Sequence, residues 1–278
     1  MPDTTATFAI LASALSDDPR EAPRLARQYG FRGVQFDAYG TRLSLPELSQ
    51  SGRREFRHMV AAQSQLVAGL RAGVGIKGLA PGADIDQVLD RLDKAMETAA
   101  GMGAPLLCVD TGPLPEPPPD ETTKPRVTQE QAGLLLLPTF AAAPAPETTT
   151  LSAVPAKVDP VFVAQVDAAL ADLGQRADRY GVMVALRTEL SSLAALDRAI
   201  RRANCPWFGV DLDPVAILRD AWDLDTAFSR LGPLVRHVRV RDACAGPSAV
   251  RSRRPWVGGI RIGTSWRATL MGRAITGG

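Results

Sequence analysis

The second half of the chain alternates short apolar runs with segments whose apolar residues recur at helical spacing. The apolar runs fall within residues 181–192, 207–220 and 234–243, and the segments of helical period lie between them, at 193–206 and 221–233. Apolar runs of roughly four to eight residues that alternate with helical patterns are typical of parallel βαβ units. This stretch therefore predicts three parallel strands joined by helices.

The first half follows the same alternation. Its apolar runs predict strands at 7–13, 33–38, 66–74 and 104–112, and its periodic segments predict helices at 20–29, 44–64, 85–101 and 160–180. Two helix starts carry capping signals: Ser16, Asp17 and Asp18 stand before Pro19, and Asp84 precedes the helix at 85–101. The whole pattern indicates a parallel α/β fold.

Charged residues stand where the predicted strands end. In parallel α/β folds the ligand binds at the C-terminal ends of the strands, so these residues are candidates for chemistry. The alternative is that they are simply solvated, or that Asp37 and Asp110 serve turns and caps. The candidates are Asp37, Asp110, Arg187, Glu189, Asp211, Asp213, His237, Arg239 and Arg241.

Side chains two positions apart on a strand share one face of the sheet. This spacing groups Arg187 with Glu189, and Asp211 with Asp213. It also groups His237, Arg239 and Arg241. If these faces point inward, three adjacent strands bring acidic and basic groups to one opening.

The segments GVMVAL-R, FGVDLDP and VRHVRVRDA resemble the later strands of the sugar phosphate isomerase/epimerase family, the xylose-isomerase-like TIM barrels. The resemblance covers roughly residues 7–112 and 160–243. It implies a (β/α)8 barrel, for which 278 residues are enough because such barrels typically need about 250. We expect the TIM-barrel domain to span residues 1–243 and to be imperfect or incomplete at the eighth strand.

The resemblance also implies a site. Members of that family typically bind a divalent metal through Glu, Asp, His and Glu at four strand ends, and the metal stabilises an enediolate while acidic residues move a proton. Here the first glutamate falls on Arg187, with Glu189 two residues later, and the aspartate falls on Asp213. The histidine position is Arg239, with His237 two residues earlier, and the last glutamate has no counterpart. The resemblance thus gives Glu189, Asp213 and His237 as catalytic residues, and as ligands of Mg²⁺, Mn²⁺ or Zn²⁺.

The arginines point to a different ligand. Guanidinium groups at Arg187, Arg239 and Arg241 would repel a divalent cation, and they suit a phosphate or carboxylate held by forked hydrogen bonds. A metal-free site is therefore the alternative. We expect the substrate to be bound by Asp37, Asp110, Arg187, Arg239 and Arg241.

Composition bears on the partners of the protein and on its cellular compartment. The net charge of +2 argues neither for nor against a nucleic-acid partner. The three cysteines lie far apart without a CxxC motif, which suits a reducing cytoplasm. No apolar run approaches about 18 residues, and the N-terminus lacks the basic region of a signal peptide. We expect a cytoplasmic protein with a small carbohydrate or sugar phosphate as its partner, and with no nucleotide cofactor, nucleic acid or membrane.

Two segments interrupt the alternation. Residues 113–159 are rich in proline, which predicts a loop insertion that is either a functional lid or a flexible insertion. Of the two, we favour a partly ordered excursion after the fourth strand. Residues 244–278 contain no Asp or Glu and form an irregular basic tail. One hypothesis is a shift of reading frame near residues 244–257, because the frame one base earlier can be decoded into an Asp-rich ending that resembles the family. The alternative is a divergent tail that binds an anionic partner.

Three functions follow. The first is a sugar or sugar phosphate isomerase or epimerase that works by proton transfer on a small, anionic carbohydrate. The second is a non-catalytic barrel that binds such a ligand after losing its metal site. The third, an endonuclease-type relative with a cluster of metals, needs several histidine ligands, and the chain has two histidines.

Overall fold

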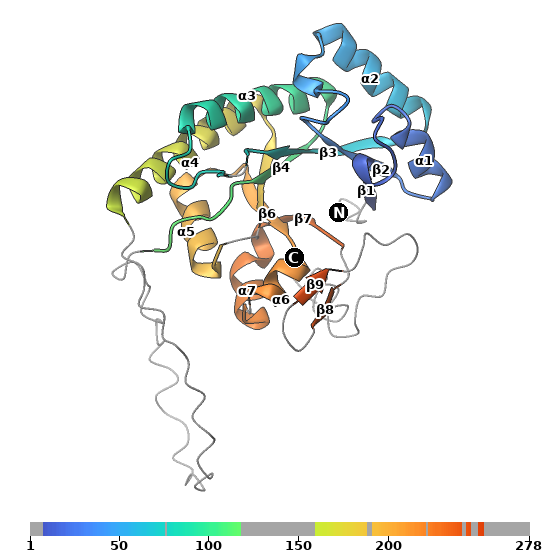
Figure 1. The fold of residues 1–278 in the computed structure, drawn as a ribbon. Coiled ribbons are helices and arrows are strands. Elements are labelled where there is room, and N and C mark those ends of the chain that lie inside the picture. The colour runs from blue at the N-terminus through green and yellow to red at the C-terminus, as the bar shows by residue number, and fades with distance from the viewer. Residues whose placement is uncertain are drawn as a thin grey trace, which may run out of the picture.

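The computed structural model describes residues 8–75, 77–117, 159–187, 191–220, 222–240, 243–245 and 250–252. Seven parallel strands form one sheet, and their order in space is their order in the chain. The sheet curls like part of a barrel wall (Figure 1). Its strands are β1 (Ala9–Leu11), β2 (Gly33–Asp37), β3 (Leu66–Gly73), β4 (Leu106–Asp110), β5 (Met183–Arg187), β6 (Phe208–Leu212) and β7 (Val235–Val238).

Helices connect the strands and cover the outer side of the curled sheet (Figure 1). The α-helices are α1 (Ala22–Gln28), α2 (Gln50–Ala62), α3 (Ile85–Met102), α4 (Pro160–Tyr180), α5 (Leu193–Ala203), α6 (Pro214–Arg219) and α7 (Leu224–Leu231), and short 3-10 turns are η1 (Ala12–Ala14), η2 (Leu45–Glu47) and η5 (Gly232–Leu234). The predicted helix at 44–64 is divided into η2 and α2, and α6 follows β6 where the sequence indicated no separate helix.

Most helix starts have the capping contact that their sequence indicates. The Asp84 carboxylate accepts the Gln87 N–H at the start of α3, and the Ser192 hydroxyl accepts the Ala195 N–H at the start of α5. The prediction for α1 was wrong, because that helix begins after Glu21 without a side-chain cap. Asp18 instead accepts the Arg20 N–H within the turn that precedes the helix.

Strand alternation divides the side chains between two environments. One set is buried between the sheet and the helices, and it includes Val34, Phe36, Leu70, Leu107, Val109, Val184, Leu186, Val210 and Leu212. The other set faces the concave side, where a small apolar cluster of Leu106, Cys108 and Ala185 lies below a polar layer. The main core therefore lies outside the sheet, and this leaves the concave side to polar groups.

The expected defect at the eighth strand is present. After β7 the described chain forms an antiparallel hairpin of β8 (Ala243–Ala245) and β9 (Val250–Ser252), which is a separate sheet. Within the described ranges, β1 pairs only with β2 and β7 pairs only with β6. The prediction of a TIM barrel that is incomplete at the eighth strand is therefore confirmed.

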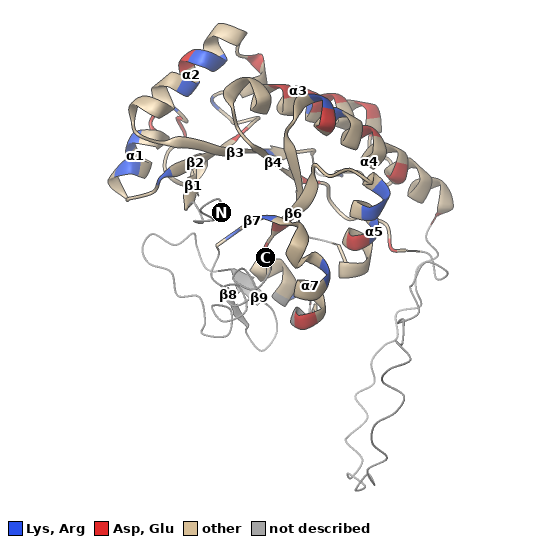
Figure 2. Ribbon diagram, turned by 180° about the vertical axis from the view of Figure 1, so that it is seen from behind, with Lys and Arg blue, Asp and Glu red and all other residues tan. Residues whose placement is uncertain are grey.

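The insertion at 113–159 and the tail at 244–278 lie largely outside the described residues, so their proposed boundaries remain predictions. Acidic and basic segments are interspersed along the outer helices α2, α3, α4 and α5 (Figure 2). None of the helices in the described ranges is both long and apolar enough to span a membrane.

Candidate functional site

A cleft of about 530 Å³ opens where the first five strands end. Its lining combines four arginines with three aspartates. This volume lies in the range of small-molecule sites, about 300–1,000 Å³. The lining residues come from the ends of β1 to β5, from the segments that follow the first two strands, and, for Arg91, from α3: Ala12, Ser13, Ser16, Asp17, Pro19, Asp37, Tyr39, Gly40, Thr41, Arg42, Leu43, Arg71, Gly73, Arg91, Asp110 and Arg187.

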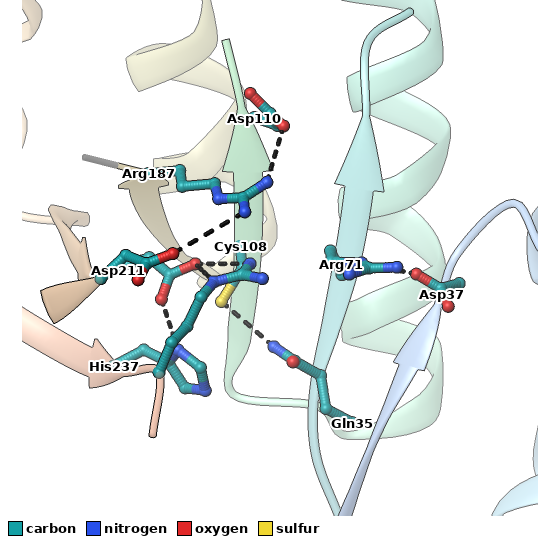
Figure 3. Close-up of polar contacts among 10 residues, drawn as sticks. Gln35, Asp37, Arg71, Cys108, Asp110, Arg187, Asp211 and His237 are labelled. Carbon is teal, nitrogen blue, oxygen red and sulfur yellow. Dashed lines mark hydrogen bonds and ion pairs between the residues drawn. The ribbon is translucent and has the colours of Figure 1, made fainter. Parts of the chain in front are cut away.

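Two ion pairs between neighbouring strands cross the floor of the cleft (Figure 3). Arg71 Nε donates to Asp37 Oδ1 at 2.6 Å, and Arg187 Nη1 donates to Asp110 Oδ2 at 2.9 Å. All four side chains remain partly exposed. The cleft therefore offers carboxylate acceptors and guanidinium donors side by side, as a ligand with both hydroxyl and anionic groups would require.

One wall of the cleft is formed by Tyr39 and Arg91. The Arg91 guanidinium lies 3.6 Å from the centre of the Tyr39 ring, in the geometry of a cation–π contact. The Tyr39 hydroxyl donates to the Arg91 carbonyl oxygen, and Arg91 Nε donates to the carbonyl of Gly73 at 3.0 Å. These contacts fix both side chains beside the end of β3.

The second group of charges is centred on Asp211, which lies on β6 and is fully buried. His237 Nδ1 lies 2.6 Å from Asp211 Oδ1, and Arg239 places Nε and Nη2 each 2.7 Å from Oδ2. An ionised carboxylate can only accept, so His237 Nδ1 is the donor. We call Asp211, His237 and Arg239 the acid–arginine cluster.

Charge and hydrogen bonding decide the ionisation of Asp211. Burial alone would raise its pKa, but the hydrogen bond from His237 and the charge of Arg239 outweigh burial and hold the pKa below its usual value. For Arg239, burial alone would lower the pKa, but the Asp211 carboxylate raises it. The two groups are therefore an ionised pair at neutral pH.

A register shift in β7 brings His237 to Asp211. Val235 pairs with Val210 and His237 pairs with Asp211, so Arg236 is an extra residue between two paired positions, as in a β-bulge. Gly209 leaves room for it, since a Cβ there would lie 2.4 Å from Arg236 Cγ. Because paired residues of parallel strands share a face, Val235 packs against the outer core while His237 faces the concave side.

Cys108 and Gln35 lie beside the acid–arginine cluster (Figure 3). Gln35 Nε2 lies 3.2 Å from Cys108 Sγ. Burial, reinforced by the charge of Asp211, strongly raises the pKa of the Cys108 thiol. Cys108 is therefore a neutral thiol, which makes it a poor nucleophile.

The structure separates the residues singled out by sequence into three groups. Asp37, Asp110 and Arg187 line the cleft, while His237 and Arg239 contact Asp211. Asp213 is fully buried, accepts the Val215 N–H at 3.1 Å and lies 3.8 Å from Arg187 Nη2. Glu189 and Arg241 lie outside the described residues.

Several residues of the site were not among the candidates taken from the sequence: Gln35, Arg71, Arg91 and Cys108. Asp211 was a candidate, because strand spacing groups it with Asp213, but it was given no catalytic or binding role. Arg91 had no signal, because it belongs to a helix whose place beside the cleft depends on the tertiary fold.

A divalent metal does not fit the residues as they are arranged. The described residues place Cys108, Asp211 and His237 together, with ligand atoms within 4.8 Å of one another. However, both oxygens of Asp211 already accept hydrogen bonds, and one of them holds the Arg239 guanidinium. A divalent cation there would have to displace a buried positive charge of the same sign.

The chain belongs to the xylose isomerase-like TIM barrel family, whose model matches residues 23–268. Comparison with curated protein sequences gave no significant match. The fold also resembles solved structures at low identity.

One similar solved structure is a 3-keto-D-glucoside 4-epimerase from E. coli, with a TM-score of 0.55 and 15% identity over 84% of this chain and 78% of that chain. Another is a D-psicose 3-epimerase with D-tagatose from Clostridium cellulolyticum, with a TM-score of 0.58 and 11% identity over 84% and 72%. A third is a xylose isomerase-like protein from Mycobacterium smegmatis in complex with magnesium, with a TM-score of 0.57 and 14% identity over 90% and 80%.

Proposed function

We propose that this chain is an isomerase or epimerase that acts by proton transfer on a small, anionic carbohydrate, such as a sugar phosphate or a sugar acid. The observation that carries the proposal is the cleft at the strand ends, in which Asp37–Arg71 and Asp110–Arg187 stand side by side. Several neighbours of the same fold are named as sugar epimerases, and three of these are described with a ketohexose.

The cleft supports a charged sugar better than a neutral one. Carboxylates at Asp37 and Asp110 accept hydrogen bonds from hydroxyl groups, while guanidiniums bind phosphate or carboxylate through paired N–H donors. Arg42, Arg71, Arg91 and Arg187 outnumber Asp17, Asp37 and Asp110 in the lining. We assign Asp37, Asp110, Arg187, Arg239 and Arg241 to substrate binding.

Proton transfer is assigned to His237, Asp213 and Glu189. Asp211 holds His237 Nδ1 as a donor, which fixes the ring's tautomer and leaves Nε2 as the nitrogen that can exchange a proton. About a quarter of the His237 side chain, 25%, is exposed, so the ring is open to a solute. Asp211 itself is a positioning residue, because both of its oxygens are engaged.

The direct test is exchange of carbon-bound hydrogen. Purified protein is incubated in D₂O with matched pairs of sugars and their phosphates, and loss of the C–H signal is followed by proton NMR. We expect exchange only with anionic members, and about a 10²- to 10⁴-fold slower exchange for His237→Gln, the range for loss of a general acid–base group. Arg57→Gln on the exposed face of α2 is the control. Exchange that is absent from every sugar would rule out the enzyme.

A second function is favoured by one observation. Asp37, Asp110 and Asp211 each form an ion pair with an arginine, which leaves them poorly suited to act as bases. A non-catalytic barrel that binds anionic carbohydrates would show ligand-dependent thermal stabilisation without C–H exchange. The same ligand panel, measured by thermal unfolding, separates the two functions.

We place either function in the cytoplasm. Cys108 and Cys205 are both free thiols, as a reducing compartment would keep them. Secretion of the intact chain in a fractionation experiment would contradict this assignment.

A further inference from the structure

Two members of the acid–arginine cluster, Asp211 and His237, form with Cys108 a set of ligand atoms that resembles an incomplete metal site. Cys108 Sγ, an Asp211 oxygen and a His237 nitrogen converge within 4.8 Å. Thiolate, imidazole and carboxylate together are typical ligands of a transition metal such as zinc. The feature that sets this cluster apart is Arg239, which reaches the same carboxylate.

Arg239 is held firmly in its position. Its backbone N–H donates to the Leu212 carbonyl at 2.8 Å, which continues the pairing of β6 with β7 beyond the last strand residue. Its side chain is 12% exposed, and Nε and Nη2 both lie 2.7 Å from Asp211 Oδ2. The guanidinium therefore has neither the freedom nor the solvent contact to swing away when a cation approaches.

The permanent charge of arginine explains why its position beside Asp211 keeps a metal cation out. A lysine or histidine beside a metal ligand can lose its proton and make room for a cation, whereas a guanidinium keeps its charge at all relevant pH values. Arg187 adds a second fixed charge nearby, at 2.9 Å from Asp110 and 3.8 Å from Asp213. Together the two side chains supply two positive charges to the acids at the ends of β4 and β6.

We propose that Arg239, assisted by Arg187, replaces a divalent cation in this chain. The positive charge of the site then belongs to side chains of the protein and not to a bound ion, and the site works without a metal. The proposal concerns the charge of the site and is independent of the substrate and of turnover.

The test is a gain of metal binding. Cobalt(II) is titrated into metal-stripped protein, and the visible and near-ultraviolet spectra are recorded, since histidine and thiolate ligands give characteristic absorption. We expect no saturable spectrum from the wild-type chain and binding of a single equivalent by Arg239→His, which exchanges the cation for a fourth donor. Isothermal titration with Mg²⁺, Mn²⁺ and Zn²⁺ gives an independent readout.

The control is Arg201→His. Arg201 pairs with Asp197 at 2.9 Å on the surface of α5, so the change creates a similar His–Asp pair away from the cluster, and we expect no metal spectrum from it. Arg239→Gln is a second variant in case the histidine disturbs folding, and it too should admit a metal.

Two results would overturn the proposal. One is stoichiometric binding of a metal by the wild-type chain that disappears in His237→Ala. The other is a folded Arg239→His or Arg239→Gln variant that still binds no metal, because Arg239 would then not be what excludes the cation. Should both variants unfold, the wild-type titration decides alone: saturable binding refutes the proposal, and its absence supports it.

Discussion

Asp211 and Arg239 stand 28 residues apart in the chain and form a buried, two-pronged ion pair in which both nitrogens lie 2.7 Å from one carboxylate oxygen. Asp211 has no exposed surface at all. Charges removed from water this completely are costly unless each is paired. The pair therefore ties the stability of the β6–β7 edge to the chemistry of the opening.

The first prediction concerns the loss of this pair. Asp211→Asn leaves the Arg239 guanidinium buried without its counter-charge, and such a change destabilises a protein by about 3–5 kcal/mol. Urea denaturation followed by circular dichroism measures the free energy of unfolding. The control is Asp172→Asn, which removes a 39% exposed carboxylate and leaves Arg176 paired with Asp93, so it should cost about 0–1 kcal/mol. Equal losses in the two variants would show that the Asp211 pair is not energetically special.

The second prediction follows from the lowered pKa of Asp211. A carboxyl whose pKa is lower in the folded state contributes stability that is fully present above its unfolded pKa, about 3.9, and that is lost as the pH falls through the folded value. The difference in unfolding free energy between wild type and Asp211→Asn should therefore stay constant above about pH 5 and shrink below about pH 4. A difference that grows on acidification would contradict the assigned direction of the shift.

The third prediction concerns the anion preference of the cleft. Arg187→Gln removes a charged donor that lines the cleft, and a hydrogen bond to a charged group is worth about 1.5–3 kcal/mol, so affinity for a sugar phosphate should fall by about 10- to 100-fold. Affinity for the unphosphorylated sugar should change much less. Calorimetric titration of both sugars measures the difference, with Arg57→Gln as the control. A similar loss for both sugars would indicate general damage to the cleft.

The fourth prediction concerns thiol reactivity. The raised pKa and 1% exposure of Cys108 should protect it from iodoacetamide at pH 8 in the folded protein. Cys205, which is only partly buried, should be alkylated faster. Peptide mass spectrometry with and without urea gives both rates. Rapid modification of Cys108 under native conditions would show that the concave side opens readily.

The fold was largely accessible from the sequence because its main signals are local. The long helix α4 at Pro160–Tyr180 has the predicted bounds, since it begins behind Asp159 with a proline in its first turn and ends at Gly181, which has a φ of 62°. Strand β1 is shorter than the predicted 7–13, because the chain turns into η1 at Ala12. The cap of α1 was misplaced because several suitable side chains stood close together before Pro19.

The site was less accessible because its contacts are not local. Spacing grouped Asp211 with Asp213, but it could not tell which of the two would meet β7. Asp213 directly follows β6 and accepts the N–H of Val215 in the first turn of α6, whereas Asp211 lies within β6, opposite His237. The sequence also gave no sign that Arg91, from the middle of α3, would lie against Tyr39.

The extra residue in β7 has a consequence for how the strand tolerates changes of length. Deleting Arg236 should leave Val235 opposite Val210 and His237 opposite Asp211, because the register already passes over that position. Deleting Val238 would instead turn Arg239 toward the helices and expel its charge from the opening. Deletion of Arg236 is thus expected to leave the acid–arginine cluster intact, whereas deletion of Val238, two residues later, is expected to remove Arg239 from it.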